Sequence, residues 1–410
     1  MSEPEGYDWL KKTHGGKKGS DDPLDWGVPG NFSDEEYDVF IKFQKEVTTR
    51  GGDFKKTIFS FGEEEGEVHA LGRWLRARKF VYDDVITMVE QATEECKKPS
   101  SDNYYPDPKD ALGIEPQIYI SQYPQLYYSY AKSGAPVFIS KPGLLNISAI
   151  TSITTMEGIL KYHWYAMIHD FGQRLRAKKE TDPNFTKFQC LIVMDLGNLG
   201  MSQVTQRALA ITKEQSKIDS LCFPETLERM VIVNAPRFFT ATWKLIKGWL
   251  DARTSAKVEL ISSRSTWEKR LRELIEEDQL PSDYGGKADD TNTVLMKEAP
   301  EGCKRQFTEL MSIRSSGSYV VQLVAGVKAD ITIFTRSTAG ATFLVADDKK
   351  KTVAPEKDAI HTGGDDLDKD QPTRIVLAEG LAGPGKFKIK GTSKVSRMTS
   401  DYYFVVCNVF

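Results

Sequence analysis

Residues 223–260 read FPETLERMVIVNAPRFFTATWKLIKGWLDARTSAKVEL and contain the patterns of a strand, a helix and a second strand. The apolar run at 230–233 is rich in β-branched residues and ends in the turn residues 234–236, a pattern typical of a buried strand. A helical pattern follows at 237–250, and a second apolar strand is expected at 258–261. Because strands alternate with helices here and along much of the chain, we predict an α/β layer with a mainly parallel sheet.

The helix expected at 237–250 is unusually apolar. At about 100° per residue, its apolar side chains cover an arc of roughly 160°, whereas a helix that covers one core needs a stripe of roughly 100°. Lys244 and Lys247 face away from this arc. Two interpretations fit: a helix wedged between a sheet and another helix, which is the commoner arrangement, or a helix that walls a cavity for an apolar ligand. The arc consists of Phe238, Phe239, Trp243, Leu245, Ile246, Trp249 and Leu250.

The composition is that of an ordinary globular protein. The chain has 410 residues, enough for two or three domains, with 40% hydrophobic and 28% charged residues. A net charge of −3 argues against nucleic-acid binding, which depends on many phosphate contacts. The five cysteines form no CxxC pair, which indicates reduced thiols rather than disulfides or a zinc site. The sequence shows neither a signal-peptide core nor the roughly 20 apolar residues that span a bilayer, so we expect a cytoplasmic protein with transient contact to membrane surfaces.

Five segments, in this order along the chain, resemble the CRAL-TRIO lipid-binding domain, the family of phosphatidylinositol and phosphatidylcholine transfer proteins. The resemblance covers about residues 32–287. It implies a helical N-terminal lobe, a mainly parallel sheet and carriage of a phospholipid without catalysis. The segments are LGRWLRARKF at 71–80, IVMDLGNLG at 192–200, FPETLERMVIVNAP at 223–236, GWLDART at 248–254 with Lys257 before the next strand, and LPSDYGGK at 280–287.

The sequence divides into five parts. Residues 1–30 are rich in Gly, Lys, Asp and Pro and are expected to be a flexible arm. The helical N-terminal lobe follows at 31–100, the CRAL-TRIO domain at 101–287, a polar linker at 288–317 and a β-rich domain at 318–410. Capping boxes are expected at Ser33 with Glu36 and at Ser265 with Glu268, the second before a helix at 266–278. Further helices are expected at 67–77, 80–97, 155–178 and 204–220, and further strands at 136–140 and 188–195.

The C-terminal part has no helical period, and turn residues separate its apolar runs, so we predict an antiparallel β-sandwich. By its position behind the CRAL-TRIO domain it resembles the GOLD module, which implies protein partners and a place at Golgi or endosomal membranes. The insert 347–372 is dense in Lys and Asp and is expected to be a solvated loop. The expected strands are 319–324, 330–335, 341–345, 374–378, 386–390 and 402–410.

The resemblance also implies a site for the lipid headgroup. Lys257 and Thr254 match the family's phosphatidylinositol-binding Lys and Thr, which offer a phosphate one charge and one hydroxyl donor. Glu225 matches the acidic residue that orients this site, and Arg78 with Lys79 matches the basic pair at the end of the N-terminal lobe. Without the family context, each residue is more simply an exposed charge on a strand, loop or helix end. With that context, inositol-lipid binding is favoured.

The phosphatidylcholine side of the resemblance has less support. Family members that hold choline phosphate use hydroxyl residues on the strand that leads into MDL, where this chain has Cys190, Leu191 and Ile192. The cargo could therefore be a different hydrophobic ligand, such as an isoprenoid or a sterol-like molecule. The remaining aromatic residues expected to line the cavity are Tyr127, Tyr165 and Phe171, and they do not identify the lipid.

Two other classes of function stay open as alternatives. An enzyme could use Gly197 and Gly200 as a phosphate cradle, but this chain has none of the motifs GxGxxG, GxxxxGK[ST], HExxH and GxSxG. His163 and His169 on one helix could hold a metal or haem, although a packed histidine is commoner. We therefore expect no catalytic residues, no metal and no cofactor apart from a bound phospholipid. The second alternative is a lipid-sensing trafficking adaptor, whose lipid occupancy changes how the sandwich meets proteins.

Overall fold

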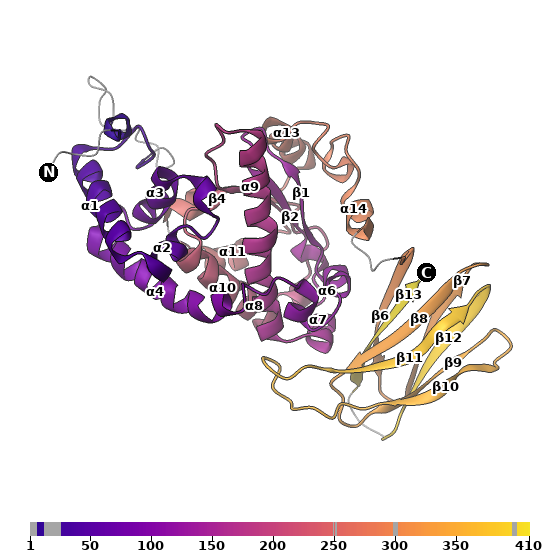
Figure 1. The fold of residues 1–410 in the computed structure, drawn as a ribbon. Coiled ribbons are helices and arrows are strands. Elements are labelled where there is room, and N and C mark those ends of the chain that lie inside the picture. The colour runs from indigo at the N-terminus through magenta and orange to yellow at the C-terminus, as the bar shows by residue number, and fades with distance from the viewer. Residues whose placement is uncertain (1–5, 12–25, 249, 251, 298–301, 396–399) are drawn as a thin grey trace. The chain divides into compact units, whose positions relative to one another are not determined.

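The computed structural model describes residues 6–11, 26–248, 250, 252–297, 302–395 and 400–410 (Figure 1). The chain divides into two compact units. The first combines 1–106, 125–143 and 163–288, and the second combines 107–124, 144–162 and 289–410.

The first unit begins with the helices α1 (Asp34–Arg50), α2 (Gly52–Ile58), α3 (Glu67–Ala77) and α4 (Tyr82–Ser101). The capping box predicted at Ser33 is confirmed: its hydroxyl accepts from the Glu36 backbone N–H at 3.2 Å, and the Glu36 carboxylate accepts from the Ser33 N–H at 2.9 Å. Leu71, Trp74 and Leu75 of α3 are fully buried. The predicted helical N-terminal region is thus confirmed. Short 3-10 helices lie at Asp8–Leu10 (η1) and Glu63–Glu65 (η2).

A five-stranded sheet in the order β1-β2-β3-β4-β5 forms the centre of the first unit. β1 (Gln125–Tyr130) pairs antiparallel with β2 (Pro136–Ser140), and β3 (Cys190–Asp195), β4 (Leu227–Val233) and β5 (Val258–Ile261) continue the sheet in parallel. The predicted α/β layer is confirmed, and β2 and β5 have the predicted bounds. The sequence did not predict β1, because its residues QLYYSY lie in a Tyr- and Pro-rich stretch without apolar alternation.

Helices alternate with these strands in the chain. The predicted helix 155–178 consists of α8 (Met156–Tyr165), a π-helix (η4, Ala166–Phe171) and α9 (Gly172–Thr181). The predicted helix 237–250 is the shorter α11 (Phe239–Lys247), which ends at Gly248. The other helices are α10 (Gln206–Cys222), α12 (Ala252–Ala256), α13 (Arg264–Leu274), η5 (Met201–Gln203) and η6 (Ser282–Tyr284).

The capping box predicted at Ser265 is wrong. α13 begins at Arg264, and its N-cap is Ser263, whose side chain makes no capping hydrogen bond. The Glu268 carboxylate instead forms ion pairs with Arg264 at 2.7 Å and with Arg272 at 3.6 Å. Both ion pairs have the four-residue spacing that stabilises helices. Glu268 therefore pairs with arginines along the helix and does not cap its start.

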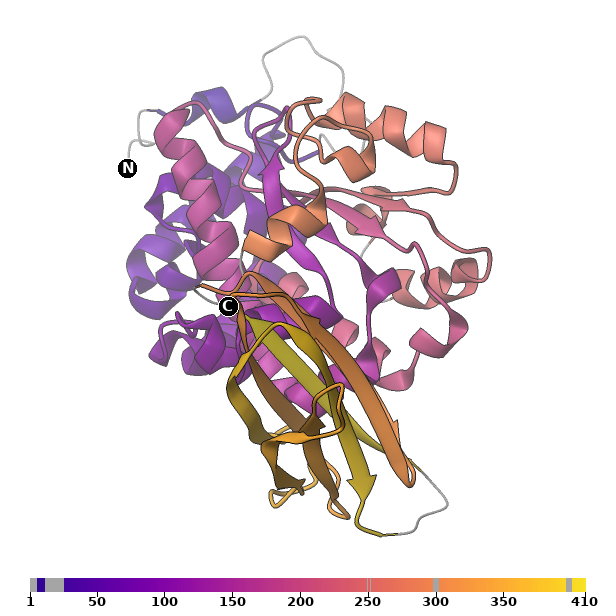
Figure 2. The same cartoon turned by 90° about the vertical axis from the view of Figure 1, so that its right-hand side faces the viewer.

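Two four-stranded antiparallel sheets form most of the second unit, in the orders β10-β9-β12-β7 and β11-β8-β13-β6. Their long strands run side by side in both views (Figure 1, Figure 2). Fully buried residues from both sheets, among them Ile333, Phe343 and Val405, share one core, so the predicted sandwich is confirmed. The strands are β6 (Arg305–Ile313), β7 (Ser316–Leu323), β8 (Lys328–Thr335), β9 (Ala341–Ala346), β10 (Thr352–Ala359), β11 (Thr373–Ala382), β12 (Gly385–Ser393) and β13 (Asp401–Val409).

Two of these strands lie where the sequence predicted none. β6 occupies part of the expected linker, and β10 occupies part of the expected loop 347–372. In β10 only Ala354 and Ala359 are buried, and its pairing with β9 is interrupted twice. A strand at a sheet edge with a mostly solvated face has no apolar alternation to reveal it.

Short helices from the middle of the chain belong to the second unit as well. Arg336 donates from Nε to the Thr151 carbonyl at 2.6 Å and from Nη2 to the Thr154 carbonyl at 3.1 Å, at the end of α7. The Gln122 amide donates to the Thr308 hydroxyl at 3.1 Å. Side chains of the sandwich thus satisfy helix-end carbonyls that lack partners within their own helix. These helices are α5 (Pro108–Leu112), α6 (Pro116–Gln122) and α7 (Ile147–Ile153). The two remaining helical segments among the described residues are η3 (Pro142–Leu144) and α14 (Thr291–Lys297).

A partly buried polar network holds the strand ends of the first unit together. Asp195, the last residue of β3, accepts through Oδ1 from the Gly197 N–H at 2.8 Å and from the Asn234 amide at 2.9 Å. Its Oδ2 accepts from the Tyr284 hydroxyl at 2.9 Å, and Asn234 in turn accepts from the Trp267 indole N–H at 3.2 Å. Burial and then the Asp195 charge raise the pKa of Tyr284 well above its ordinary value. The carboxylate is therefore a structural acceptor for three donors.

We expect Asp195→Ala to lower the free energy of unfolding by about 3 kcal/mol, because it strands three donors and a buried unpaired polar group costs about 1–3 kcal/mol. Tyr284→Phe removes one of the three hydrogen bonds and should cost about 1 kcal/mol. Urea unfolding followed by tryptophan fluorescence measures both. Equal midpoints for Asp195→Ala and wild type would contradict this role.

Candidate functional site

A buried carboxylate with several cations lies where β4 and β5 begin. Glu225 precedes β4, and Lys257 precedes the neighbouring β5, so the parallel pairing of the two strands brings them together. The Lys257 ammonium donates to Glu225 Oε2 at 3.0 Å. Arg253 of α12 places its Nε 3.1 Å from the same oxygen, and Arg76 of α3 places its Nε 4.0 Å away.

This cluster is almost closed to solvent. The side chain of Lys257 is 5% exposed and that of Glu225 6%, while Arg76 and Arg253 reach only 8% and 13%. When Arg253 is left out of the count, the two buried cations Arg76 and Lys257 still share the single carboxylate of Glu225. Among the side chains that the structure describes there, positive charge thus exceeds negative charge.

The pKa shifts of the basic groups in and near the cluster agree with this excess of positive charge. Burial lowers the pKa of Lys257 from its ordinary value, although Glu225 raises it in part. Burial also lowers the pKa of Arg76, to about 10. His69, two helical turns back on α3, has its pKa lowered to about 4 by burial and then by the Arg76 charge. Since burial disfavours these cations, a bound anion would improve the local electrostatics.

The predicted headgroup residues divide into two groups. Glu225 and Lys257 meet directly, and Thr254 lies half-buried one turn before Lys257, whose N–H donates to the Thr254 carbonyl at 3.1 Å. Arg78 is half-buried at the end of α3 and donates to the Ala77 carbonyl at 3.0 Å, and Lys79 is exposed. Headgroup contacts by Arg78 and Lys79 stay a prediction.

Besides Arg253, the structure adds two arginines that the sequence analysis did not single out. Arg76 approaches Glu225, and Arg73 donates to the Pro224 carbonyl at 2.9 Å while it pairs with the buried Glu65. Both arginines lie on α3 three residues apart, on one side of the helix. That spacing within RWLR, in a helix otherwise rich in apolar residues, is the signal that could have found them.

An apolar row crosses one face of the sheet next to this cluster. The register pairs Tyr127 with Phe138, Phe138 with Ile192, Ile192 with Met230 and Met230 with Val258, so all five strands contribute one residue. All five side chains keep accessible surface, whereas Leu191, Val193 and Val231, which point to the opposite face, are buried. Removal from bulk water nevertheless raises the pKa of Tyr127 well above its ordinary value. The row therefore lies deep in the unit without being fully packed.

α11 covers the same face of the sheet. Phe239 is 4% exposed and shares a core with Leu196 and Ile232, and the half-buried Trp243 and Ile246 pack against this core together with Met230 and Val258. Of the other predicted gate residues, Phe238 and Leu250 are half-buried and Leu245 is 50% exposed. Trp249 lies outside the described residues. The helix presents both a packed and an accessible apolar side.

Phe171 and Tyr165, also predicted for the cavity, differ in their surroundings. Phe171 is 1% exposed, stacks on Tyr127 with ring centroids 5.7 Å apart and meets the edge of Phe61 at 5.3 Å. Tyr165 is half-buried and stacks on His169 at 5.8 Å. Phe171 thus joins the packed core beside the apolar row.

The residues considered for metal or nucleotide chemistry have other partners. His163 Nε2 lies 2.7 Å from the Asp219 carboxylate, and His169 Nε2 lies 2.7 Å from the Asn103 carbonyl. The Gly197 N–H is bonded to Asp195. Within the described ranges, no group of three or more His, Cys, Asp or Glu side chains could hold a metal ion. None of the described helices is both long and apolar enough to cross a membrane.

Part of the site lies in a segment that matches a known domain family. Residues 121–286 match the CRAL/TRIO domain family. The chain is 28% identical to the phosphatidylinositol/phosphatidylcholine transfer protein SFH12 of Arabidopsis thaliana, over 55% of this chain and 40% of that protein. It is also 30% identical to the phosphatidylinositol/phosphatidylcholine transfer protein SFH13 of Arabidopsis thaliana, over 67% of this chain and 43% of that protein. The chain thus spans well under half the length of these plant relatives.

A fungal relative and one solved structure are also similar. The SEC14 cytosolic factor of Eremothecium gossypii is 28% identical over 64% of this chain and 80% of that protein. The crystal structure of Sfh5 aligns with a TM-score of 0.47 and 15% identity, over 64% of this chain and 91% of that chain.

We expect Glu225→Gln to lower the free energy of unfolding by about 3–5 kcal/mol in low-salt buffer without phosphate, because it leaves Arg76 and Lys257 buried without their carboxylate. The matched control is Glu259→Gln on β5, whose carboxylate pairs with Arg229 and Arg270 but is 25% exposed. That pair is open to solvent and should cost about 1 kcal/mol or less. Similar unfolding midpoints for the two variants in chemical denaturation would contradict the charge imbalance.

Proposed function

We propose that this protein binds a phospholipid, phosphatidylinositol above all, and moves or presents it between membranes, because residues 121–286 match the CRAL/TRIO domain family. The observation that carries the proposal is the buried cluster in which Arg76 and Lys257 share the Glu225 carboxylate. A phosphodiester brings the negative charge that such a cluster lacks. The lipid classes come from the names of the plant relatives.

The chemistry of the cluster favours inositol over choline. Inositol carries hydroxyl groups that can donate to Glu225, and Thr254 can donate to a phosphate oxygen. A choline headgroup is a cation without a donor, and it would have to enter a region that already holds excess positive charge. On β3, the positions where hydroxyl residues would hold choline phosphate are Cys190, Leu191 and Ile192, of which Ile192 belongs to the apolar row.

The acyl chains would lie along the apolar row. Each buried CH₂ group contributes about 0.8 kcal/mol, so two chains can drive binding without any special residue. Val258 of the row directly follows Lys257 of the cluster in the chain. The cluster thus lies at the start of the strand that contributes one residue to the apolar row.

We propose that α11 acts as the gate. Its exposed surface carries Leu245 between Lys244 and Lys247, which suits brief contact with a membrane surface, and Trp243 and Ile246 are only half-buried. Outward movement of α11 would open the face of the sheet that carries the row, and Gly248 at its end could act as the hinge.

The remaining parts of the proposal concern location and partners. We propose that the protein is cytoplasmic, contacts Golgi or endosomal membranes peripherally, and uses its sandwich as a GOLD-like module for protein partners. We propose no catalytic role and no cofactor. The relatives are named as transfer proteins, and Asp195, the carboxylate at the end of β3, already accepts from three protein donors.

We expect Lys257→Met to reduce phosphatidylinositol transfer between vesicles at least tenfold, because the phosphate loses its buried cation. Stability should stay equal or rise, since an apolar side chain of similar length avoids the cost of burying a charge. Fluorescent lipid transfer and thermal unfolding measure the two effects. Lys269→Ala, an exposed lysine on α13, is the control and should transfer normally. Undiminished transfer by Lys257→Met would remove the headgroup assignment.

Native mass spectrometry of the full chain, purified from cells, should show an added mass equal to one phospholipid. An added mass equal to that of an isoprenoid or a sterol would show that the cargo is another hydrophobic ligand and not a phospholipid. A bound nucleotide would contradict carriage and favour an enzyme. A chain without any added mass, which also fails to take up phosphatidylinositol from vesicles, would favour the adaptor.

A further inference from the structure

One end of the β-sandwich carries two uncharged tips, each a turn that connects a strand of one sheet to a strand of the other. The β7–β8 turn reads VAGV at 324–327, and the β11–β12 turn with its flanking strand residues reads LAGPG at 381–385. The Gly383 N–H donates to the Val327 carbonyl at 3.0 Å, so the two tips lie side by side. Val324 is 65% exposed, and Ala325, Ala382 and Pro384 are exposed as well. We call residues 324–327 and 381–385 the tip surface.

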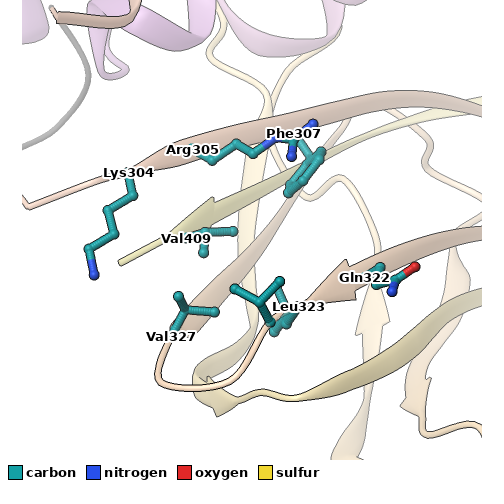
Figure 3. A pocket seen from close by; sticks show the side chains of 8 residues that line it. Lys304, Arg305, Phe307, Gln322, Leu323, Val327 and Val409 are labelled. Atoms are coloured by element: carbon teal, nitrogen blue, oxygen red, sulfur yellow. The ribbon is translucent and has the colours of Figure 1, made fainter.

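An open pocket continues this apolar surface between the two sheets. It has a volume of about 240 Å³, and Figure 3 shows Phe307, Leu323, Val327 and Val409 around it. Val324 of the tip surface also lines it, and Lys304, Arg305 and Gln322 complete its wall. The sandwich core thus ends in accessible apolar surface at the tips.

Exposed cations surround the tip surface. Lys304 and Arg305 lie at the start of β6, Lys328 directly follows the first tip, and Lys386 follows the second. None of these four forms an ion pair with a side chain in the described ranges, and Arg305 lies 4.4 Å above the Phe307 ring. Lys388 and Lys390 continue the basic stripe along β12 on the solvent face.

The acidic side chains at this end are fewer. The Asp330 carboxylate accepts from the Gly380 N–H at 2.7 Å, and Glu379 stands beside it in the sequence. The β9–β10 turn adds Asp347 and Asp348, but three lysines at 349–351 directly follow them. Cations therefore prevail around the tips.

We propose that this end of the sandwich docks the protein on an anionic bilayer. The tips enter the interfacial layer, and Lys304, Arg305, Lys328 and Lys386 contact the lipid phosphates around them. Apolar insertion and a basic patch are the two signals whose combination gives membrane binding that either alone does not. Lysine suits this position because its long stem lies along the apolar layer while the ammonium stays hydrated.

The side chains of the tips favour a bilayer over a protein partner. Protein interfaces draw most of their binding energy from large anchors such as Trp, Tyr and Arg in closely packed pockets. The tips offer only Val, Ala, Leu, Pro and Gly, on two narrow turns ringed by lysine. Small apolar side chains suit a fluid surface, which needs no matching pocket. This docking does not depend on which lipid the other unit carries.

The test is co-sedimentation of the full chain with vesicles of phosphatidylcholine alone and with equimolar phosphatidylcholine and phosphatidylserine. Wild type should bind the anionic vesicles at least tenfold more strongly, and added salt should reduce this binding. Val324→Asp combined with Lys386→Glu should lose at least tenfold of it. Lys304→Glu combined with Lys386→Glu, which leaves the apolar tips intact, should lose a comparable part.

The matched control reverses the same chemistry at the other end of the sandwich, with Val395→Asp combined with Lys369→Glu, and should bind like wild type. Circular dichroism of every variant checks folding. An unchanged mass of bound lipid in each variant shows that the substitutions leave the proposed cargo site intact, so that a loss of vesicle binding is assigned to the tip surface. Wild-type-like binding by Val324→Asp/Lys386→Glu would overturn docking, as would equal binding to both vesicles. A wild-type chain that ignores vesicles but forms a dimer that Val324→Asp abolishes would assign the tips to a contact between copies instead.

Discussion

The structure of the first unit depends on one carboxylate held away from water among cations. Glu225 comes from the turn before β4, Lys257 from the residue before β5, and Arg76 from a helix some 150 residues earlier. These groups can meet only if β4 and β5 are neighbours and α3 reaches their first residues. Glu225 adopts a φ of +59°, a backbone conformation that costs a non-glycine residue about 1–2 kcal/mol. The ion pairs offset this cost, so the cluster fixes the local backbone as well as the contacts between distant segments.

A cluster built for stability alone would have a different composition. Buried ion pairs replaced by well-packed apolar residues often leave a protein equally or more stable. Burial lowers the pKa of both Lys257 and Arg76, which shows that Glu225 compensates them incompletely. Meanwhile the apolar row starts at Val258, the next residue along the chain. A polar end with unmet positive charge and an incompletely packed apolar surface together match an amphiphile with an anionic head.

The sequence predicted the parts of this arrangement that repeat a local pattern. β5, β2 and α3 have their predicted bounds because each combines a clear period with a turn or breaker at its end. β1, β6 and β10 were missed because edge strands and half-solvated strands do not alternate. The pairing of Glu225 with Lys257 followed from a resemblance to a family. The sequence did not single out Arg76. Choosing Arg76 over Arg78 in RARK requires the helix phase at the last turn of α3, where helix boundaries are least certain.

The proposed lipid carriage would also limit how tightly each surface should hold a membrane. A cargo must stay bound during passage through water, and in the proposed carrier the deep row and closed cluster would hold it by apolar burial and a phosphate contact that water cannot easily replace. A membrane must be left again after each exchange. Val324 and the alanines of the tips bury little area, and lysine charges interact with phosphates in a way that salt and distance weaken. Large aromatic tips would give longer residence on one membrane and fewer transfers. The contrast between small tips on the sandwich and large rings around the sheet is therefore what a reversible carrier requires.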